Sequence, residues 1–154
     1  MIKQINHQDR HTAKQILDVQ IPAYKIEAQI IGFDGIPQLK DTVETIETSL
    51  ERFIGYIHEN QLIAFLSYSK DETEYQICRL VVHPGFFKQG IARKLLKYFM
   101  NEIVRPHEKV IVSTGADNVP AINLYKSEGF AFQKNIEVAP KFYISLFERE
   151  TTVN

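Results

Sequence analysis

Hydrophobic residues recur along this chain with two different periods. Segments in which every second residue is apolar predict strands, and segments in which apolar residues return every three or four positions predict helices. Strands are expected over residues 2–5, 53–58, 62–68, 75–82, 109–114, 130–135 and 141–147. Helices are expected over residues 6–21, 24–31, 41–50, 90–103 and 121–127.

Turn-forming and capping residues set the ends of these segments. Pro22 has no backbone N–H, so it is expected to bend or end the first helix and to leave residues 24–31 as a second helical piece. Asp41 predicts the start of the next helix, which would keep Leu50 on its apolar face. The dipeptide at 59–60 is expected to close a hairpin between two strands.

When residues 6–21 and 24–31 are counted together as one helix bent at Pro22, the order of these elements is β-α-α-β-β-β-α-β-α-β-β, which predicts an α/β (α+β) fold. Hairpins would join the antiparallel strands, and the helix after residue 90 would carry the chain over the sheet to form one parallel pair. We therefore expect a mixed central sheet of about seven strands with helices on both faces. No linker or repeat divides the chain, so residues 1–154 are expected to form one domain.

The composition restricts the classes of function. The 154 residues carry a formal net charge of −1, which gives no general case for binding nucleic acid or a membrane surface. The five histidines are scattered and show no ligand spacing, so no metal site is expected. The single cysteine, Cys78, excludes an intrachain disulfide, and the first residues have no apolar signal-peptide core, so we expect a cytoplasmic protein.

The stretch from Leu80 to Met100, LVVHPGFFKQGIARKLLKYFM, joins a β-branched strand to an amphipathic helix through a Pro-Gly turn and a basic loop. The first turn of such a helix has backbone N–H groups without partners and the positive end of the helix dipole, so it attracts phosphate. Gly90 would let a ligand approach the backbone closely. The spacing fits neither a Walker P-loop nor a dinucleotide-binding fingerprint, although it predicts a ligand that carries a diphosphate.

A second motif lies one strand further on, from Asn118 to Phe130, NVPAINLYKSEGF. Together the two motifs resemble the two signatures of the GNAT superfamily of N-acetyltransferases. Gly90 and Ala92 match the end of the family's cofactor loop, Q/R-x-x-G-x-G/A. The second signature is matched by Asn118, Ala121, Ile122, Leu124, Tyr125, Gly129 and Phe130. The order of elements is similar to that of the family over nearly the whole chain.

The resemblance implies that acetyl-CoA is the cosubstrate. In this family the cofactor lies between two parallel strands that splay apart, here residues 75–82 and 109–114, and its pantetheine amides bond to the unpaired strand backbone. The first turn of the following helix holds the pyrophosphate. The cofactor-binding residues implied are Leu80, Val81, Val82, Phe87, Lys88, Gln89, Gly90, Ile91, Ala92, Arg93, Asn118 and Tyr125.

Phe87 departs from the family pattern, which has arginine or glutamine at this position. The change removes a charge-assisted contact with the loop or the phosphates, although the backbone donors are unaffected. Lys88 either compensates in part or stays a solvated surface residue. We therefore expect acetyl-CoA to bind more weakly than is usual for the family.

The resemblance also implies the reaction, in which a primary amine attacks the thioester of acetyl-CoA directly and takes its acetyl group. Tyr125 matches the tyrosine that serves as general acid for the departing CoA thiolate. The backbone N–H of Val81 or Val82 would stabilise the oxyanion. Glu27 lies in the segment that borders the acceptor site in the family, and it is our candidate for the general base. The alternatives for the base are Glu72, Glu74, Tyr24 and Tyr75.

The acceptor is left open between small-molecule and peptide amines. The loop over residues 31–37 is expected to wall its pocket, with Phe33 and Asp34 facing the acceptor. A homodimer is frequent in the family, and no feature of this sequence decides for or against one.

A second interpretation belongs to a different class of function. A protein with the GNAT fold can bind acyl-CoA without turnover and act as a sensor or an interaction module. Asn118 and Tyr125 are present and favour an enzyme, whereas Phe87 favours this alternative. Release of the CoA thiol in the presence of amines would distinguish the two.

Overall fold

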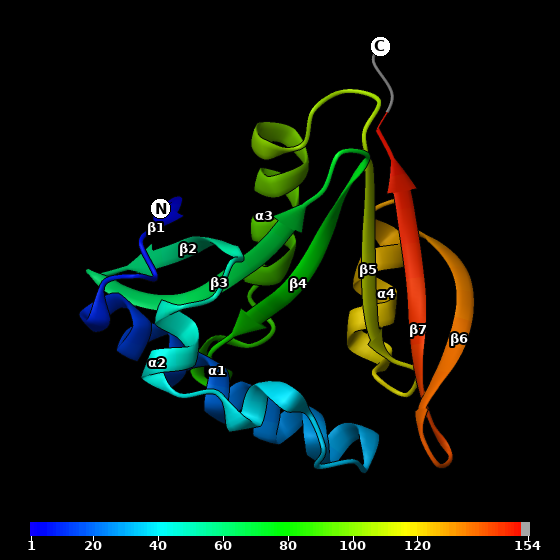
Figure 1. The fold of residues 1–154 in the computed structure, drawn as a ribbon, viewed down its shortest axis with the longest axis horizontal. Helices are drawn as coiled ribbons and strands as arrows, with labels where there is room; N and C mark the ends of the chain where they lie inside the picture. The colour runs from blue at the N-terminus through cyan, green and yellow to red at the C-terminus, as the bar shows by residue number, and fades with distance from the viewer. Residues whose placement is uncertain (152–154) are drawn as a thin grey trace.

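The protein folds into a seven-stranded sheet with helices on both faces (Figure 1). The computed structural model describes residues 1–151. The strands are β1 (Ile2–Ile5), β2 (Arg52–His58), β3 (Gln61–Lys70), β4 (Glu74–Val82), β5 (Lys109–Gly115), β6 (Ala131–Ala139) and β7 (Phe142–Glu150). The helices are α1 (Arg10–Ile31), α2 (Val43–Glu47), α3 (Ile91–Tyr98) and α4 (Val119–Ser127). Short 3₁₀ turns lie at η1 (Pro37–Lys40) and η2 (Pro84–Phe86), and α3 continues as a π-helical turn, η3 (Phe99–Ile103).

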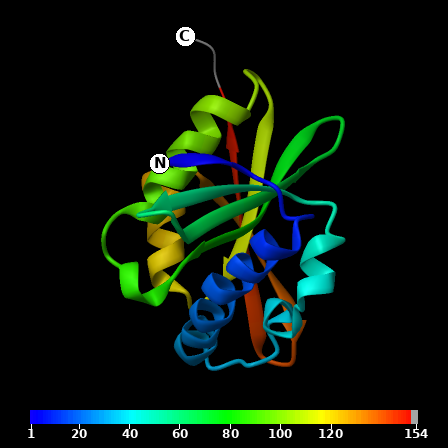
Figure 2. The ribbon, with the colours of Figure 1, turned by 90° about the vertical axis from the view of Figure 1, so that its left-hand side faces the viewer.

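The sheet has the mixed topology that the order of elements predicts. Its strand order is β1-β2-β3-β4-β5-β7-β6, and every neighbouring pair is antiparallel except β4 and β5, which are parallel and joined through α3. Helices α1 and α2 cover one face, and α3 and α4 cover the other (Figure 2). The hairpin between β2 and β3 turns at 59–60, where both residues have positive φ, as predicted. The predicted fold class is confirmed.

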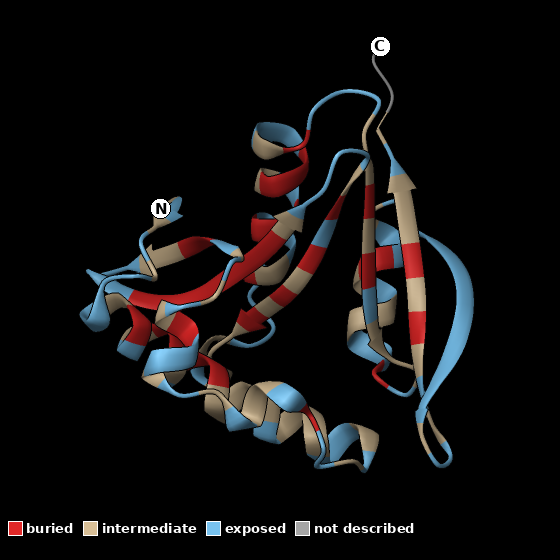
Figure 3. Ribbon diagram, in the orientation of Figure 1, coloured by how far each residue is buried: buried red, intermediate tan, exposed pale blue. Residues whose placement is uncertain are grey.

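Two clusters of buried side chains hold these helices on the sheet. Figure 3 colours the buried residues of the strands and helices red. On one face α3 and its continuation insert Leu95, Leu96 and Phe99, which are fully buried. On the other face Ile16 of α1 and Ile46 of α2 are fully buried. Each such side chain contributes roughly 1.5–3 kcal/mol by its burial, so the helices that frame the site are firmly attached to the sheet.

A β-bulge interrupts the pairing of β4 with β3. Ser67 of β3 pairs with Arg79, but Tyr68 pairs with Ile77, so that Cys78 is an extra residue on β4 without an opposite partner. A bulge bends its strand and increases the local twist. The sequence pattern of alternating residues contains no sign of this insertion, because the bulge depends on the pairing with β3.

The bulge has two consequences for the site. It reverses the alternation of β4, so that Ile77 packs in the core beneath α3 whereas Val81 packs in the core beneath α1. It also coincides with the end of the pairing between β4 and β5, whose last paired residues are Ile77 and Val112. Beyond this point the two strands diverge, as Figure 1 shows, and the edge of β4 that would face β5 has no strand partner within the described chain.

Helix α1 differs from its predicted form. Pro22 neither ends nor breaks it, and residues 10–31 form one helix. The proline leaves the carbonyl of Asp18 without an intrahelical donor, but Asp18 is exposed, so water can bond to that carbonyl. The prediction of two pieces was therefore wrong. The buried face that continues through the first half of α1 consists of Ala13, Ile16, Val19 and Gln20.

Helix α2 is shorter than the predicted 41–50, and its first residue is Val43. Thr42 is its N-cap, and the side chains of Thr42 and Thr45 bond reciprocally to each other's backbone N–H. The helix ends before Leu50, which is 99% exposed, so the predicted apolar face does not extend to that residue. Asp41 does not cap the helix, because its carboxylate is bonded to Arg79.

Candidate functional site

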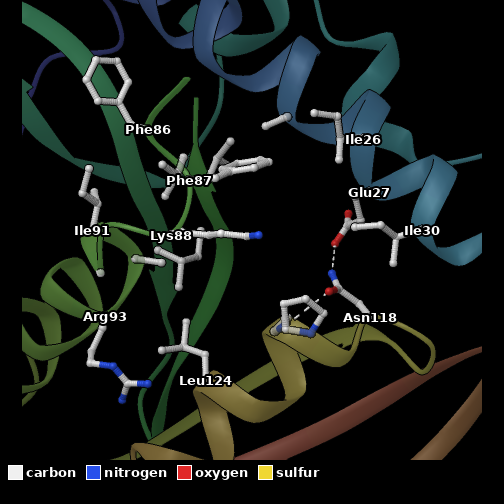
Figure 4. Close-up of a pocket in the computed structure, with 18 of the residues that line it drawn as sticks. Ile26, Glu27, Ile30, Phe86, Phe87, Lys88, Ile91, Arg93, Asn118 and Leu124 are labelled. Atoms are coloured by element: carbon white, nitrogen blue, oxygen red, sulfur yellow. Dashed lines mark hydrogen bonds between the residues drawn. The ribbon is translucent and has the colours of Figure 1, made fainter. Parts of the chain in front are cut away.

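The divergence of β4 from β5 leaves a cavity of about 520 Å³ between the two helical layers. Its walls come from α1, the second half of β4, the loop that leads into α3, and the first two turns of α4 (Figure 4). The structure brings to this cavity every residue that the resemblance implies for the cofactor, except Gln89. Gln89 belongs to the loop before α3, but it is exposed and does not line the cavity.

The loop into α3 directs its backbone at the cavity. Lys88 and Gly90 both adopt the left-handed conformation, with φ of 63° and 75°. The first donor bonded within the helix is the N–H of Lys94, which donates to Gly90 O at 3.1 Å. The preceding N–H groups of the first turn are therefore free of intrahelical acceptors. A Cβ on Gly90 would meet no atom within 4 Å, which shows that the glycine faces open space.

Two cations, one in this loop and one in the first turn of α3, have different surroundings. The side chain of Lys88 extends into the cavity (Figure 4). Arg93 is held at the end of α4, where its Nη1 donates to Ser127 Oγ and to Glu128 Oε1, both at 2.8 Å. This contact ties the start of α3 to the end of α4, so the two helices keep a fixed separation across the cavity. Lys88, whose ammonium has no hydrogen bond or ion pair within the described residues, is thus the positive charge available to a phosphate.

The turn before this loop is fixed by His83. Its Nδ1 accepts a hydrogen bond from the N–H of Gly85 at 3.0 Å, so it serves as the cap of a short 3₁₀ turn. Phe87 follows the turn, lines the cavity and is 40% exposed. Its ring occupies the position at which the resemblance leads us to expect a polar side chain.

A carboxylate and an amide meet across the cavity. Glu27 on α1 accepts a hydrogen bond from Asn118 Nδ2, with 2.6 Å between the amide nitrogen and Glu27 Oε1 (Figure 4). Asn118 is also the N-cap of α4, because its Oδ1 accepts from the N–H of Ala121 at 3.3 Å. Burial raises the pKa of Glu27, and the hydrogen bond from Asn118 opposes that rise in part.

Two tyrosines border the same end of the cavity. Tyr125 of α4 is 5% exposed, and its ring packs against Phe130 and Phe147 at centroid distances of 5.7 and 6.2 Å. Tyr24 lies one turn before Glu27 on the same face of α1. Burial raises the pKa of both phenols, and the nearby carboxylate of Glu27 raises them further, so both hydroxyls stay protonated near neutral pH.

The other candidates for the general base lie elsewhere. Glu74 pairs with Lys109 at 3.7 Å where β4 begins, at the end of the strand away from the cavity. Tyr75 donates its hydroxyl to the carbonyl of Ile103 at 3.2 Å. Glu72 is exposed in the turn before β4. Among the predicted candidates, the structure places only Glu27 and Tyr24 at the cavity.

The loop after α1 does not face the cavity as predicted. Phe33 stacks on Phe142 at 4.5 Å, and Phe33 and Asp34 line a separate, shallow hollow on the outer side of α1. The stacking draws the loop toward the turn between β6 and β7. Phe33 and Asp34 therefore do not line the main cavity, and their place beside the acceptor stays a prediction.

A buried charged cluster supports the site from behind and was missed. Arg79 is 8% exposed, and its Nη1 donates to Asp41 Oδ2 at 2.7 Å and to Gln20 Oε1 at 2.8 Å. Its Nε and Nη2 donate to the two oxygens of Glu51 at 3.0 and 3.2 Å. Gln20 lies one turn before Tyr24, so the cluster fixes α1 relative to β4. Two features of the sequence could have indicated this cluster. Gln20 lies on the apolar face of a helix, and Arg79 lies between apolar residues of a strand.

Comparisons with known proteins agree with this architecture. A family model described as the Acetyltransferase (GNAT) family matches residues 15–130. The UPF0157 protein YqkA of Bacillus subtilis (strain 168) is 43% identical over 147 residues, which cover 96% of this chain and 43% of that protein. The chain thus spans less than half the length of this relative.

Solved structures share the fold at low sequence identity. The ribosomal-protein-S18-alanine N-acetyltransferase of Escherichia coli superposes with a TM-score of 0.76 at 15% identity, covering 100% of this chain and 95% of that one. The protein yncA of Salmonella typhimurium, solved with its cofactor acetyl-CoA, gives a TM-score of 0.72 at 13% identity, covering 100% of this chain and 95% of that one.

Proposed function

The chain belongs to the GNAT family of acetyltransferases, and on this basis we propose that it transfers the acetyl group of acetyl-CoA to a primary amine. The observation that carries the proposal is the meeting of a splayed strand pair, an open helix start, a carboxylate and a buried phenol around one cavity. Each of these parts has a task in amide formation from a thioester, and none of them requires a bound metal.

The unpaired edge of β4 and the start of α3 provide two contacts for acetyl-CoA. The backbone of Leu80 to Val82 offers strand-like hydrogen bonds to the two amides of the pantetheine arm. The free N–H groups at Ile91 and Ala92, with Lys88 beside them, suit the pyrophosphate. A structural neighbour solved with acetyl-CoA supports this class of ligand.

Glu27 and Tyr125 would divide the proton transfers between them. An alkylammonium has a pKa near 10, so the amine must lose a proton before its nitrogen can form a bond to the thioester carbon. Burial raises the pKa of the Glu27 carboxylate and makes it a better acceptor for that proton. The carbon–sulfur bond then breaks as the Tyr125 hydroxyl donates its proton to the departing thiolate, and the nitrogen releases its second proton, which restores the Tyr125 phenol through solvent.

The acceptor end of the cavity favours one class of amine. Glu27 is the only carboxylate among the lining residues, and it lies between Ile26 and Ile30 on the same face of α1. A single negative charge flanked by apolar side chains suits an amine on an apolar arm, since a polycation would leave its other charges without partners. We propose such amines, which include peptide N-termini, in preference to polyamines or aminoglycosides.

A thiol-release assay with a panel of amines tests the proposed function. Purified protein and acetyl-CoA are combined with phenethylamine, a peptide with an apolar first residue, spermidine and an aminoglycoside, and free CoA is measured. We expect amine-dependent release, with kcat/KM at least about tenfold higher for the first two amines. Binding of acetyl-CoA without release by any amine would instead favour the non-catalytic sensor.

Replacing Phe87 by arginine is expected to strengthen acetyl-CoA binding about threefold to tenfold. The guanidinium would restore a charge-assisted contact at the rim of the cavity, and at a position 40% exposed such a contact contributes roughly 1 kcal/mol. The dissociation constant is measured by calorimetric titration. Phe132→Arg, at a position 49% exposed on the outer strand β6, is the matched control. An unchanged dissociation constant in Phe87→Arg would show that the aromatic residue does not weaken binding.

The domain organisation and the location of the protein in the cell are also proposals. We propose that residues 1–154 act as a single N-acetyltransferase domain in the cytoplasm, where the free thiol of Cys78 would stay reduced. No helix within residues 1–151 is long and apolar enough to span a membrane. The homodimer frequent in the family stays a prediction, and size-exclusion chromatography with light scattering would test it.

A further inference from the structure

The side chain of Asn118 is held at both ends. Its oxygen accepts from the backbone N–H of Ala121, and its nitrogen donates to Glu27 Oε1. The residue is 9% exposed. In the described part of the chain, this amide is the only hydrogen-bond donor to the Glu27 carboxylate.

The two contacts select one orientation of the amide. If its oxygen and nitrogen were exchanged, the NH₂ group would oppose the N–H of Ala121 and the oxygen would oppose the carboxylate of Glu27. Both opposed pairs are repulsive, so the cap contact forces the donor toward Glu27. The donor is therefore preorganised by the start of α4, before any substrate binds.

We propose that Asn118 is a positioning residue for Glu27, in addition to any contact that it makes with acetyl-CoA. This inference rests on the proposed function, in which Glu27 accepts the proton of the amine. Tyr125 lies two turns after Asn118 on α4, so this one short helix would place both the carboxylate and the phenol that move protons. The contact joins residues 91 positions apart in the sequence, and it fixes α1 against α4 across the cavity.

The chemical effect of this contact has a definite sign. A hydrogen bond to the charged carboxylate favours its ionised form, so it lowers the pKa of Glu27 against the rise caused by burial. Activity requires the ionised form and increases as the pH rises through that pKa. Loss of the donor should therefore move the rising limb of the pH–rate profile to higher pH.

The other groups that face Glu27 do not produce such a limb. Tyr24 from α1 and Tyr125 from α4 keep their protons through neutral pH, because burial raises their pKa values. Lys88 extends into the cavity from the loop before α3, and it is the same residue in the wild type and in both Asn118 variants. The rising limb therefore reports mainly on Glu27.

The test compares Asn118→Ser and Asn118→Asp with the wild type. Serine and aspartate are both good N-caps, so α4 is expected to form in each variant, and circular dichroism checks this. The serine removes the donor, and the aspartate adds a negative charge beside the carboxylate. We measure kcat against pH with saturating acetyl-CoA, and the acetyl-CoA dissociation constant at each pH.

The midpoint of the rising limb is expected to increase from wild type to Asn118→Ser to Asn118→Asp. A shift of one pH unit makes the serine variant about tenfold slower on the acid side and nearly equal to wild type above the limb. Asn101→Ser is the matched control, since Asn101 is exposed and does not line the cavity. Its profile should be unchanged.

Two outcomes separate this inference from the proposed function. A loss in Asn118→Ser that is the same at every pH, with a matching loss of acetyl-CoA affinity, would overturn the positioning role and leave Asn118 as a cofactor contact. The second outcome is the turnover and the pH–rate profile of Glu27→Gln. If it keeps both wild-type turnover and the rising limb, Glu27 is not the base, and the proposed mechanism fails regardless of Asn118.

Discussion

Replacing Tyr125 by phenylalanine is expected to lower kcat about 100-fold and to leave the dissociation constant of acetyl-CoA within about threefold of wild type. The phenol is the only hydroxyl of α4 that lines the cavity, and it is the proposed donor to the departing thiolate. Phenylalanine keeps the ring contacts with Phe130 and Phe147, so the fold should be unaffected. Thiol release gives kcat, and calorimetry gives the affinity.

The pH dependence follows from the environment of Tyr125. Because burial raises its pKa above the ordinary value, the phenol keeps its proton, and no decline in rate due to Tyr125 is expected below about pH 10. Tyr98→Phe is the matched control, since Tyr98 lies on α3 and does not line the cavity. If Tyr125→Phe retains kcat within threefold of this control, the general-acid role is excluded.

Features that depend on neighbours in sequence were predictable. The start of α3 after Gly90 follows from local chemistry, because a glycine permits positive φ. Helix α4 begins two residues before the predicted residue 121, and its cap at Asn118 was not predicted, although asparagine is a favourable N-cap. The parallel pair of β4 and β5 follows from the need for a crossover helix between parallel strands. These features account for the cavity and for nearly all of its predicted lining.

Features that depend on distant partners were not predictable. The bulge at Cys78 arises from pairing with β3, and it turns Arg79 toward α1, where Asp41 and Glu51 neutralise it. The continuity of α1 through Pro22 depends on the core beneath its first half, which outweighs one lost hydrogen bond. Local propensity contains no information about either.

The contact between Glu27 and Asn118 also depends on residues far apart in the sequence. Glu27 was a candidate only because its segment borders the acceptor site in a family that the chain resembles. Its contact with Asn118 and its place near Tyr125 emerge from the packing of α1 over the opened sheet. Glu27, Asn118 and Tyr125 could each be named from the sequence, but their proximity depends on the fold.

Replacing Arg79 by methionine is expected to lower the free energy of unfolding by about 3–5 kcal/mol. Methionine matches the aliphatic part of arginine, so the change removes the charge and its hydrogen bonds while most of the apolar contacts are kept. Asp41 and Glu51 would then face each other in a partly buried space without a cation, and Gln20 would lose its donor. Urea unfolding followed by circular dichroism measures the difference.

The matched control is the exposed ion pair between α1 and α2. Arg10 contacts Glu44 at 3.5 Å and Glu47 at 3.4 Å, but its side chain is 59% exposed, so Arg10→Met should cost no more than about 1 kcal/mol. A loss in Arg79→Met no larger than in this control would show that the buried cluster contributes little net stability. The cluster is also expected to affect catalysis, because Gln20 anchors the turn of α1 that precedes Tyr24 and Glu27. Acetyl transfer by Arg79→Met should then fall even at temperatures where the protein stays folded.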